Sequence, residues 1–436
     1  MKKVLFICVT MLLICISGKA TERNLLLIPY PQQVSIKQGN YNLTDNVKIG
    51  ADPLFTQELK KLQEVLTEDF GLKSQIVKPS KADISLCYDA SFMQEEKEAY
   101  QLEVTDMKIT IRAQMATGIF YGIQSLRQLI KSEAGKWIIP KLTITDYPAL
   151  SWRSFMLDEG RYFKGEKVVK QILDEMALLK MNVFQWHLTD DQGWRIEIKK
   201  YPRLTEIGAF RDSTQMEWYE SHHYDGKPHG GFYTQTQIRS IIKYASERHI
   251  TIIPEIEMPG HSAAAIAAYP WLSATGKEIK VPCNFGVQYD VFNVTDPKVL
   301  NFLNDVIDEV TTLFSSGILH IGGDEVRYDQ WNASSSVQKF IQEKGFSSAS
   351  DIQVWFTNQM SKVIAQKGWR MMGWNDITGE KLHHFQSGDK EGTERLAPGT
   401  IVQFWKGDSD ILQRTAEQGQ HIVNSYNNFT YLNYSY

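Results

Sequence analysis

The sequence predicts a small α+β domain followed by a larger α/β domain of the (β/α)8 barrel type. After Trp152, short apolar stretches alternate with amphipathic helical stretches, as parallel strands with covering helices do. Polar or aromatic residues follow one apolar stretch after another, and the chemistry of such barrels lies at the carboxyl ends of their strands. A doubly wound sheet is the alternative, but no Gly-rich dinucleotide loop favours it.

The composition is that of a globular protein, with 436 residues, 42% hydrophobic and 22% charged. A net charge of -4 and the lack of a Lys/Arg-rich patch give no electrostatic case for nucleic acid as a partner. Beyond the N-terminus, no segment approaches the ~20 apolar residues that cross a bilayer. No motif predicts a cofactor or a metal, and the oligomeric state stays open.

Residues 1–20 are expected to be a secretory signal peptide, because two lysines precede an apolar stretch that ends in small residues near Ala20. We therefore expect an exported protein, periplasmic or secreted. Cys15 offers the alternative of a lipid-anchored envelope protein. Of the four cysteines, Cys87 and Cys283 remain after cleavage, and we expect both to be buried free thiols.

Residues 22–147 predict the α+β domain. Apolar and polar residues alternate over 100–104 and again over 109–111, which indicates a half-buried hairpin. Residues 117–130 then place Ile and Leu at helical spacing, so a helix should cover this hairpin. The run Asp146-Tyr147-Pro148 breaks the pattern, and we place the domain boundary there.

Residues 148–436 predict the barrel. The expected strands are Phe155–Asp158, Val183–Leu188, Thr251–Ile256, Ile318–Gly322, Arg370–Trp374, Ile401–Trp405 and His421–Asn424. The helix after the first strand should bury Val168, Val169, Ile172, Leu173, Met176 and Leu179. These are seven strands rather than eight, which would leave two unpaired edges in a parallel core. We therefore expect either an unrecognised strand or a truncated chain that lacks the last strand.

Chemically useful residues follow these strands in order. They are Asp158 and Arg161, then His187, Asp190 and Asp191, then Glu255, Glu257 and His261, then Asp324 and Glu325, and finally Trp374 and Trp405. Each has an ordinary structural interpretation by itself, as a core histidine, a loop carboxylate or a core tryptophan. Their convergence at one face of a barrel predicts a site.

The adjacent acids Asp324 and Glu325 follow a buried strand and two glycines, although neighbouring like charges repel and burial disfavours ionisation. Acids mixed with tryptophans suggest a sugar substrate. Most glycosidases place two carboxyl groups on opposite sides of the scissile bond, about 5–9.5 Å apart. Adjacent acids fit better if one donates a proton and the other handles a substrate group that acts as the nucleophile, such as a 2-acetamido carbonyl.

The sequence resembles the exo-acting β-N-acetylhexosaminidases of glycoside hydrolase family 20. The matching segments are WRSFMLDEGRYF (152–163), MNVFQWHLTDDQGWRIEI (181–198), ITIIPEIEMPGH (250–261) and LHIGGDEV (319–326), with weaker matches at GWNDI (373–377) and VQFWKG (402–407). LIPYPQQV and GIFYGIQSLRQLI resemble the small α+β domain of that family. The resemblance thus covers nearly all of the mature chain and implies retaining, substrate-assisted hydrolysis of a terminal N-acetylhexosamine in a glycan or glycoconjugate.

By this resemblance, Glu325 is the general acid and base, and Asp324 orients the acetamido group and stabilises an oxazolinium intermediate. Arg161 and Asp190 would bind sugar hydroxyls, and His261 would lie in the network behind the acid. The pocket walls and the ligand to the acetamido carbonyl would be Trp355, Trp374, Trp405 and Tyr431. We expect the pKa of Glu325 to be raised by Asp324 and aromatic surroundings, and Asp324 to stay ionised.

Two departures from the family pattern bear on these roles. Asn433 stands where the family usually has Asp, and the chain ends before the final strand that carries a Trp-x-Glu motif in the family. Three rival interpretations remain: a non-catalytic sugar-binding barrel, a metal-dependent hydrolase built from His187, Asp190, His261 and Asp324, and an ordinary two-carboxylate glycosidase. No H-x-H or H-E-x-x-H spacing supports the metal-dependent one.

Overall fold

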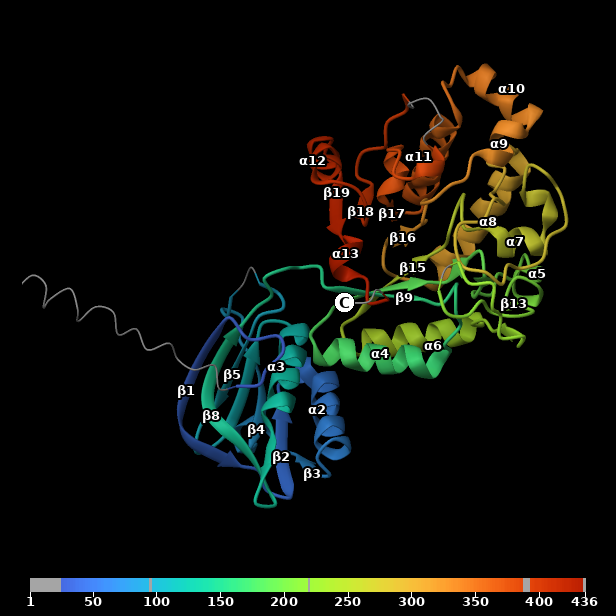
Figure 1. The fold of residues 1–436 in the computed structure, drawn as a ribbon. Coiled ribbons are helices and arrows are strands. Elements are labelled where there is room, and N and C mark those ends of the chain that lie inside the picture. The colour runs from blue at the N-terminus through green and yellow to red at the C-terminus, as the bar shows by residue number, and fades with distance from the viewer. Residues whose placement is uncertain (1–24, 94–95, 219, 387–392, 434–436) are drawn as a thin grey trace, which may run out of the picture. The chain divides into compact units, whose positions relative to one another are not determined.

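The computed structural model describes residues 25–93, 96–218, 220–386 and 393–433 (Figure 1). The expected signal peptide, with Cys15, lies outside the described residues. The chain divides into two compact units between Ala149 and Leu150.

The first unit contains one eight-stranded sheet of mixed direction, in the order β1-β8-β5-β6-β4-β2-β3, with β7 paired to β8. Its strands are β1 (Gln33–Asn42), β2 (Asn46–Ala51), β3 (Lys73–Ile76), β4 (Ile84–Tyr88), β5 (Tyr100–Val104), β6 (Ile109–Ala113), β7 (Lys131–Glu133) and β8 (Lys136–Asp146). The pairs among β6, β4, β2 and β3 are parallel, and the other pairs are antiparallel. The predicted hairpin is the antiparallel pair β5 and β6.

Helices α2 (Thr56–Glu68) and α3 (Ala116–Leu129) lie together on one face of this sheet (Figure 1). The side chains of α3 that recur at helical spacing, Ile119, Ile123 and Leu126, are fully buried. This helix packs on the hairpin as predicted, because the same spacing puts them all on one side.

The second unit is a parallel half-barrel of seven strands, which confirms the predicted fold class. The strands are β9 (Ser154–Asp158), β10 (Val183–His187), β15 (Thr251–Glu255), β16 (Ile318–His320), β17 (Arg370–Trp374), β18 (Ile401–Phe404) and β19 (His421–Asn424). Neighbours along the chain are neighbours in the sheet, and every pair is parallel. All seven predicted strands are thus present, and β9 and β19 lie at the two ends of the order.

The helices of this unit are α4 (Glu166–Leu178), α5 (Arg203–Glu206), α6 (Gln235–Ser246), α7 (Ala263–Ala268), α8 (Pro297–Leu313), α9 (Asp329–Ala333), α10 (Ser335–Lys344), α11 (Ala349–Gln366), α12 (Ser409–Glu417) and α13 (Asn427–Thr430). Local sequence explains where they begin: a Thr234–Gln237 capping box starts α6, and Asp296 before Pro297 starts α8. In α4 the predicted apolar face is buried at Val169, Leu173 and Met176. Leu179 was predicted wrongly, because it follows the last turn of α4 and is exposed.

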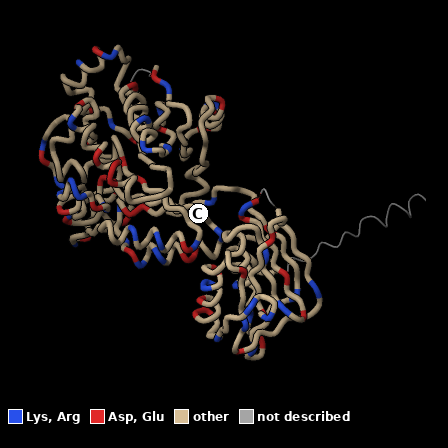
Figure 2. Tube along the Cα trace, turned by 180° about the vertical axis from the view of Figure 1, so that it is seen from behind, with Lys and Arg blue, Asp and Glu red and all other residues tan. Residues whose placement is uncertain are grey.

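Cys87 and Cys283 are free thiols as predicted, but both are half-buried rather than buried. Acidic and basic residues are interspersed along the described trace of both units (Figure 2). Among the described helices, none has both the length and the apolar character that crossing a bilayer requires.

Candidate active site

The register of the parallel strands brings ionisable side chains together at one edge of the half-barrel. In the strand register, His187 at the end of β10 lies opposite Asp158 on β9 and opposite Glu255 on β15. Glu255 in turn lies opposite His320 on β16. Strands of a parallel sheet all end on the same side, so these residues and the loops that follow them share one face.

A pocket of about 490 Å³ opens at this face. It is lined by Ser154, Phe155, Met156, Asp158, Arg161, Gln185, His187, Asp324, Glu325, Trp374, Gln403, Trp405, Asn424, Ser425, Thr430, Tyr431, Leu432 and Asn433. Six of the nine predicted site residues therefore meet here: Arg161, Asp324, Glu325, Trp374, Trp405 and Tyr431.

The turn after β16 explains why two glycines precede the acid pair. Gly322 and Gly323 have φ of +63° and +86°, and a Cβ on Gly322 would lie 1.6 Å from Glu257 Oε2. Glu325 also has a positive φ of 52°, which is unfavourable for a residue with a side chain and is typical of functional positions. Its N–H donates to Asp376 Oδ1 at 3.2 Å, which helps to hold this conformation.

His261 lies between two pairs of acids. Its Nδ1 is 3.2 Å from Asp190 Oδ1 and 3.3 Å from Asp191 Oδ2. Its Nε2 is 3.6 Å from Asp324 Oδ2 and 3.5 Å from Glu325 Oε2. Burial alone would lower the pKa of His261, but the charges of Asp190 and Asp324 outweigh it and raise the pKa well above its ordinary value. His261 is therefore a buried cation at neutral pH.

The predicted rise in the pKa of Glu325 is wrong. Burial alone would raise the pKa of Glu325, but the hydrogen bond and charge of His261, with His383 and Arg161, lower it to about 2. Burial raises the pKa of Asp324 instead, and the nearby Asp376 and Glu325 charges add to the effect. The sequence prediction counted the repulsion between the two acids but not the cations that the fold places beside Glu325.

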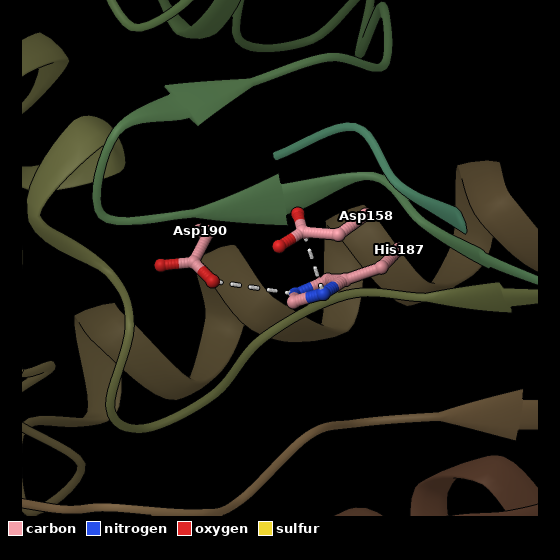
Figure 3. A group of neighbouring side chains, drawn as sticks. All are labelled: Asp158, His187 and Asp190. Atoms are coloured by element: carbon pink, nitrogen blue, oxygen red, sulfur yellow. Dashed lines mark ion pairs between the residues drawn. The ribbon is translucent and has the colours of Figure 1, made fainter. Parts of the chain in front are cut away.

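Asp158 and Asp190 both point toward the imidazole of His187 (Figure 3). The His187 nitrogens lie 3.7 Å from Asp158 Oδ1 and 3.6 Å from Asp190 Oδ2. Arg161 bridges the same two acids, at 2.9 Å to Asp158 Oδ2 and 3.2 Å to Asp190 Oδ2. Asp190 is fully buried and is not among the described residues that line the pocket; it contacts Arg161 and His261.

Among the described residues, four groups of acids and histidines have the spacing of metal ligands: Asp158–His187–Asp190, His187–Glu255–Glu257, Asp190–Asp191–His261 and His261–Asp324–Glu325. Each contains His187 or His261. The charges of Glu255 and Asp158 raise the pKa of His187 well above its ordinary value, although burial opposes this. Protonated imidazoles at His187 and His261 would neutralise part of the carboxylate charge in all four groups.

Three aromatic side chains form a wall of the pocket, and two of them are held by buried acids. Trp374 Nε1–H donates to Glu255 Oε1 at 2.8 Å, and Trp405 Nε1–H donates to Asp376 Oδ2 at 2.9 Å. Tyr431 stacks on Trp405 with ring centroids 6.2 Å apart. Such rings suit the apolar face of a sugar because their orientation is fixed before binding.

Trp355 was predicted to be part of this wall but is not among the described residues that line the pocket. It lies in α11 and packs against Phe340 and Phe346, at 5.1 and 6.4 Å between ring centroids. Asn433, at the position that departs from the family pattern, does line the pocket.

Sequence reasoning missed three residues of this face. Asp376 and His383 contact Glu325. Of these two, only Asp376 could have been recognised from the sequence, because it follows Trp374, the last residue of a predicted strand, by two positions. Arg195 belongs to the segment 181–198 that resembles the family, but it was assigned no role from the sequence; it is fully buried. Within the part of the chain that the structure describes, its guanidinium donates to the backbone carbonyls of Glu159, Gly160, Gln192, Ala209 and Gly231. It thereby ties together the loops that carry Arg161 and Asp190.

Comparison with known proteins agrees with this geometry. Residues 150–436 match the model for the glycosyl hydrolase family 20 catalytic domain, and residues 24–147 match that for domain 2 of the same family. A β-hexosaminidase of Porphyromonas gingivalis is 38% identical over 432 residues, which cover 94% of this chain and 52% of that protein. The chain thus spans about half the length of that relative.

Two solved structures are similar over both units. A β-N-acetylhexosaminidase from Bacteroides fragilis is 32% identical, with a TM-score of 0.78 and coverage of 94% of this chain and 77% of that one. An exo-β-N-acetylglucosaminidase from Vibrio harveyi, in complex with N-acetylglucosamine, is 29% identical, with a TM-score of 0.78 and coverage of 91% and 60%.

Proposed function

This chain belongs to glycosyl hydrolase family 20, and from that premise we propose that its pocket hydrolyses a terminal, non-reducing, β-linked N-acetylhexosamine from a glycan. One observation carries the proposal. The neighbours Asp324 and Glu325 place carboxylate oxygens within 4.8 Å of each other and of a His261 nitrogen, beside a wall of aromatic rings. N-acetylglucosamine is the first candidate sugar, because the Vibrio harveyi relative was solved with it.

The proposed reaction has two steps. In the first, Glu325 protonates the glycosidic oxygen while the acetamido carbonyl oxygen of the substrate attacks C1, so the C1–oxygen bond breaks and an oxazolinium ion forms. Asp324 orients the amide and faces its positive charge. In the second step, Glu325 takes a proton from water, the water oxygen attacks C1, the ring opens, and the β-configured sugar is released.

The proton that Glu325 donates is proposed to come from His261. The low pKa of Glu325 and the raised pKa of His261 favour the proton on the imidazole before the substrate binds. The two side chains are 3.5 Å apart, so the proton can pass to Glu325 when a bound sugar excludes water, without any change in net charge.

Replacing His261 by Asn should move the alkaline limb of kcat/KM to lower pH by about one unit or more. In the wild type the shared proton is retained up to the raised pKa of His261, whereas in the variant it is lost at the carboxyl pKa of Glu325. Rates with 4-nitrophenyl N-acetyl-β-glucosaminide across the pH range check this. The exposed His223→Asn change is the control, and an alkaline limb shared by all three proteins would contradict the proton source.

A panel of 4-nitrophenyl glycosides tests the function itself. We expect release from N-acetyl-β-glucosaminide, little or none from β-glucoside, and inhibition by a thiazoline analogue of the oxazolinium ion, because only the acetamido sugar supplies the nucleophile. Equal rates on both glycosides would favour a two-carboxylate glycosidase. Product binding without turnover would favour a sugar-binding barrel, and activity lost on exhaustive chelation would favour a metal-dependent hydrolase.

A further inference from the structure

Two different histidines approach the carboxylate of Glu325, one at each oxygen. His261 Nε2 lies 3.5 Å from Oε2, and His383 Nδ1 lies 3.6 Å from Oε1. His383 belongs to the segment after β17, between the short 3-10 helices Asn375–Thr378 and His384–Gln386. It is buried, and no part of the proposed reaction uses it.

Asp376 fixes His383 relative to Glu325. Asp376 Oδ1 accepts from His383 Nε2 at 2.7 Å and from the Glu325 N–H at 3.2 Å, and its Oδ2 accepts from Trp405. One buried carboxylate thus holds the backbone of the acid, the imidazole beside it and a wall of the pocket. The hydrogen bond from Nε2–H to Asp376 also orients the ring so that Nδ1 faces Glu325 Oε1.

The other neighbours of His383 fix its ring plane and its Nδ1. The ring stacks on Phe385 and Trp405, with centroids 5.0 and 6.0 Å away. Lys406 Nζ lies 3.3 Å from Nδ1. The charged groups facing His383 are therefore Asp376, Glu325 and Lys406, with the Arg327 guanidinium 4.8 Å from the Phe385 ring behind it.

We propose that His383, held by Asp376 and Lys406, is a positioning residue that orients Glu325 for proton transfer to the leaving group. The proposal rests on the proposed function of Glu325 and extends it. His261 holds the proton at Oε2, and His383 with the Lys406 cation restrains Oε1, so the carboxyl group cannot rotate between its acid and base steps. The charge of His383 also contributes to the low pKa of Glu325.

The test replaces His383 by Phe, which keeps a stacking ring, and by Gln, which keeps a polar atom near Glu325. With N-acetylchitobiose, whose leaving group needs the acid, we expect kcat/KM of His383→Phe to fall about 10-fold to 100-fold. With the 4-nitrophenyl substrate the loss should be several-fold smaller, and His383→Gln should recover part of it. His384→Phe, at the neighbouring exposed position, is the matched control.

A double-mutant cycle separates this role from a general effect on pocket shape. In a Glu325→Gln background, His383→Phe should change kcat/KM less than about twofold, because its partner is already gone. Equal losses in both backgrounds, or on both substrates, would overturn the proposal. The carboxyl pKa of Glu325, measured by NMR with Glu325→Gln as the assignment control, should rise in His383→Phe whether or not the protein turns over, and an unchanged pKa would also overturn it. A wild type that turns over neither substrate would instead refute the proposed function.

Discussion

Glu325→Gln should lower kcat/KM for N-acetylchitobiose by about 10³-fold, the larger of the two effects that we expect at the acid pair. The amide keeps the shape of the side chain but cannot deliver a proton to the leaving oxygen. The sugar alkoxide is then a poor leaving group, and the first step becomes limiting. Steady-state hydrolysis of N-acetylchitobiose measures the loss.

The same variant should lose far less on the 4-nitrophenyl substrate, because nitrophenolate departs with little help from an acid. Glu343→Gln makes the same chemical change at an exposed position of α10 and should leave both rates unchanged. Near-normal turnover of N-acetylchitobiose by Glu325→Gln would exclude this residue as the general acid. An equal loss on both substrates would indicate damage to the pocket instead.

Asp324→Asn should lower kcat for the 4-nitrophenyl N-acetyl-β-glucosaminide by about 10²-fold to 10³-fold. Asp324 is 9% exposed, and burial raises its pKa despite the nearby His261, so a further cation beside it would stabilise its charge. A positively charged oxazolinium ion supplies that cation, and a neutral amide cannot respond to it. The affinity for a thiazoline inhibitor should weaken in parallel, which a binding titration measures.

Asp308→Asn on α8, whose side chain is exposed, is the control and should change neither value. The free energy of unfolding should not fall in Asp324→Asn, because the substitution removes a buried charge while keeping the volume. Unchanged kcat and unchanged thiazoline affinity in Asp324→Asn would show that the intermediate does not depend on this carboxylate.

Much of the fold could be predicted because each element carries its own local signal. The apolar runs that end in Asp158, His187 and Glu255 form parallel strands in the structure. The apolar residues at helical spacing in α3 form its buried face. Once the strands are parallel, topology alone sends their carboxyl ends to one side. The site face was therefore predictable although its strand-end residues extend from Asp158 to Trp405 along the chain.

The pattern of residues along the chain does not specify the environment of each side chain. Burial raises the pKa of Asp324, whereas His261 and His383, which reach the pair from separate loops, lower the pKa of Glu325. Trp355 shares the residue type of the pocket walls but packs among the phenylalanines beside α11. Distances of 3 to 4 Å decide such effects, and a pattern along the chain does not encode them.

By itself, then, the sequence determined the strand order, the face that carries chemistry and the acid pair, since these follow from periodicity and from chain direction. Only the tertiary structure decided which cations lie beside Glu325, that Asp190 is buried beneath Arg161, and that Asp376 and His383 join the acid. The physical reason is that charge interactions depend on separation in space and on burial, and both are set by loops that meet only after the chain has folded.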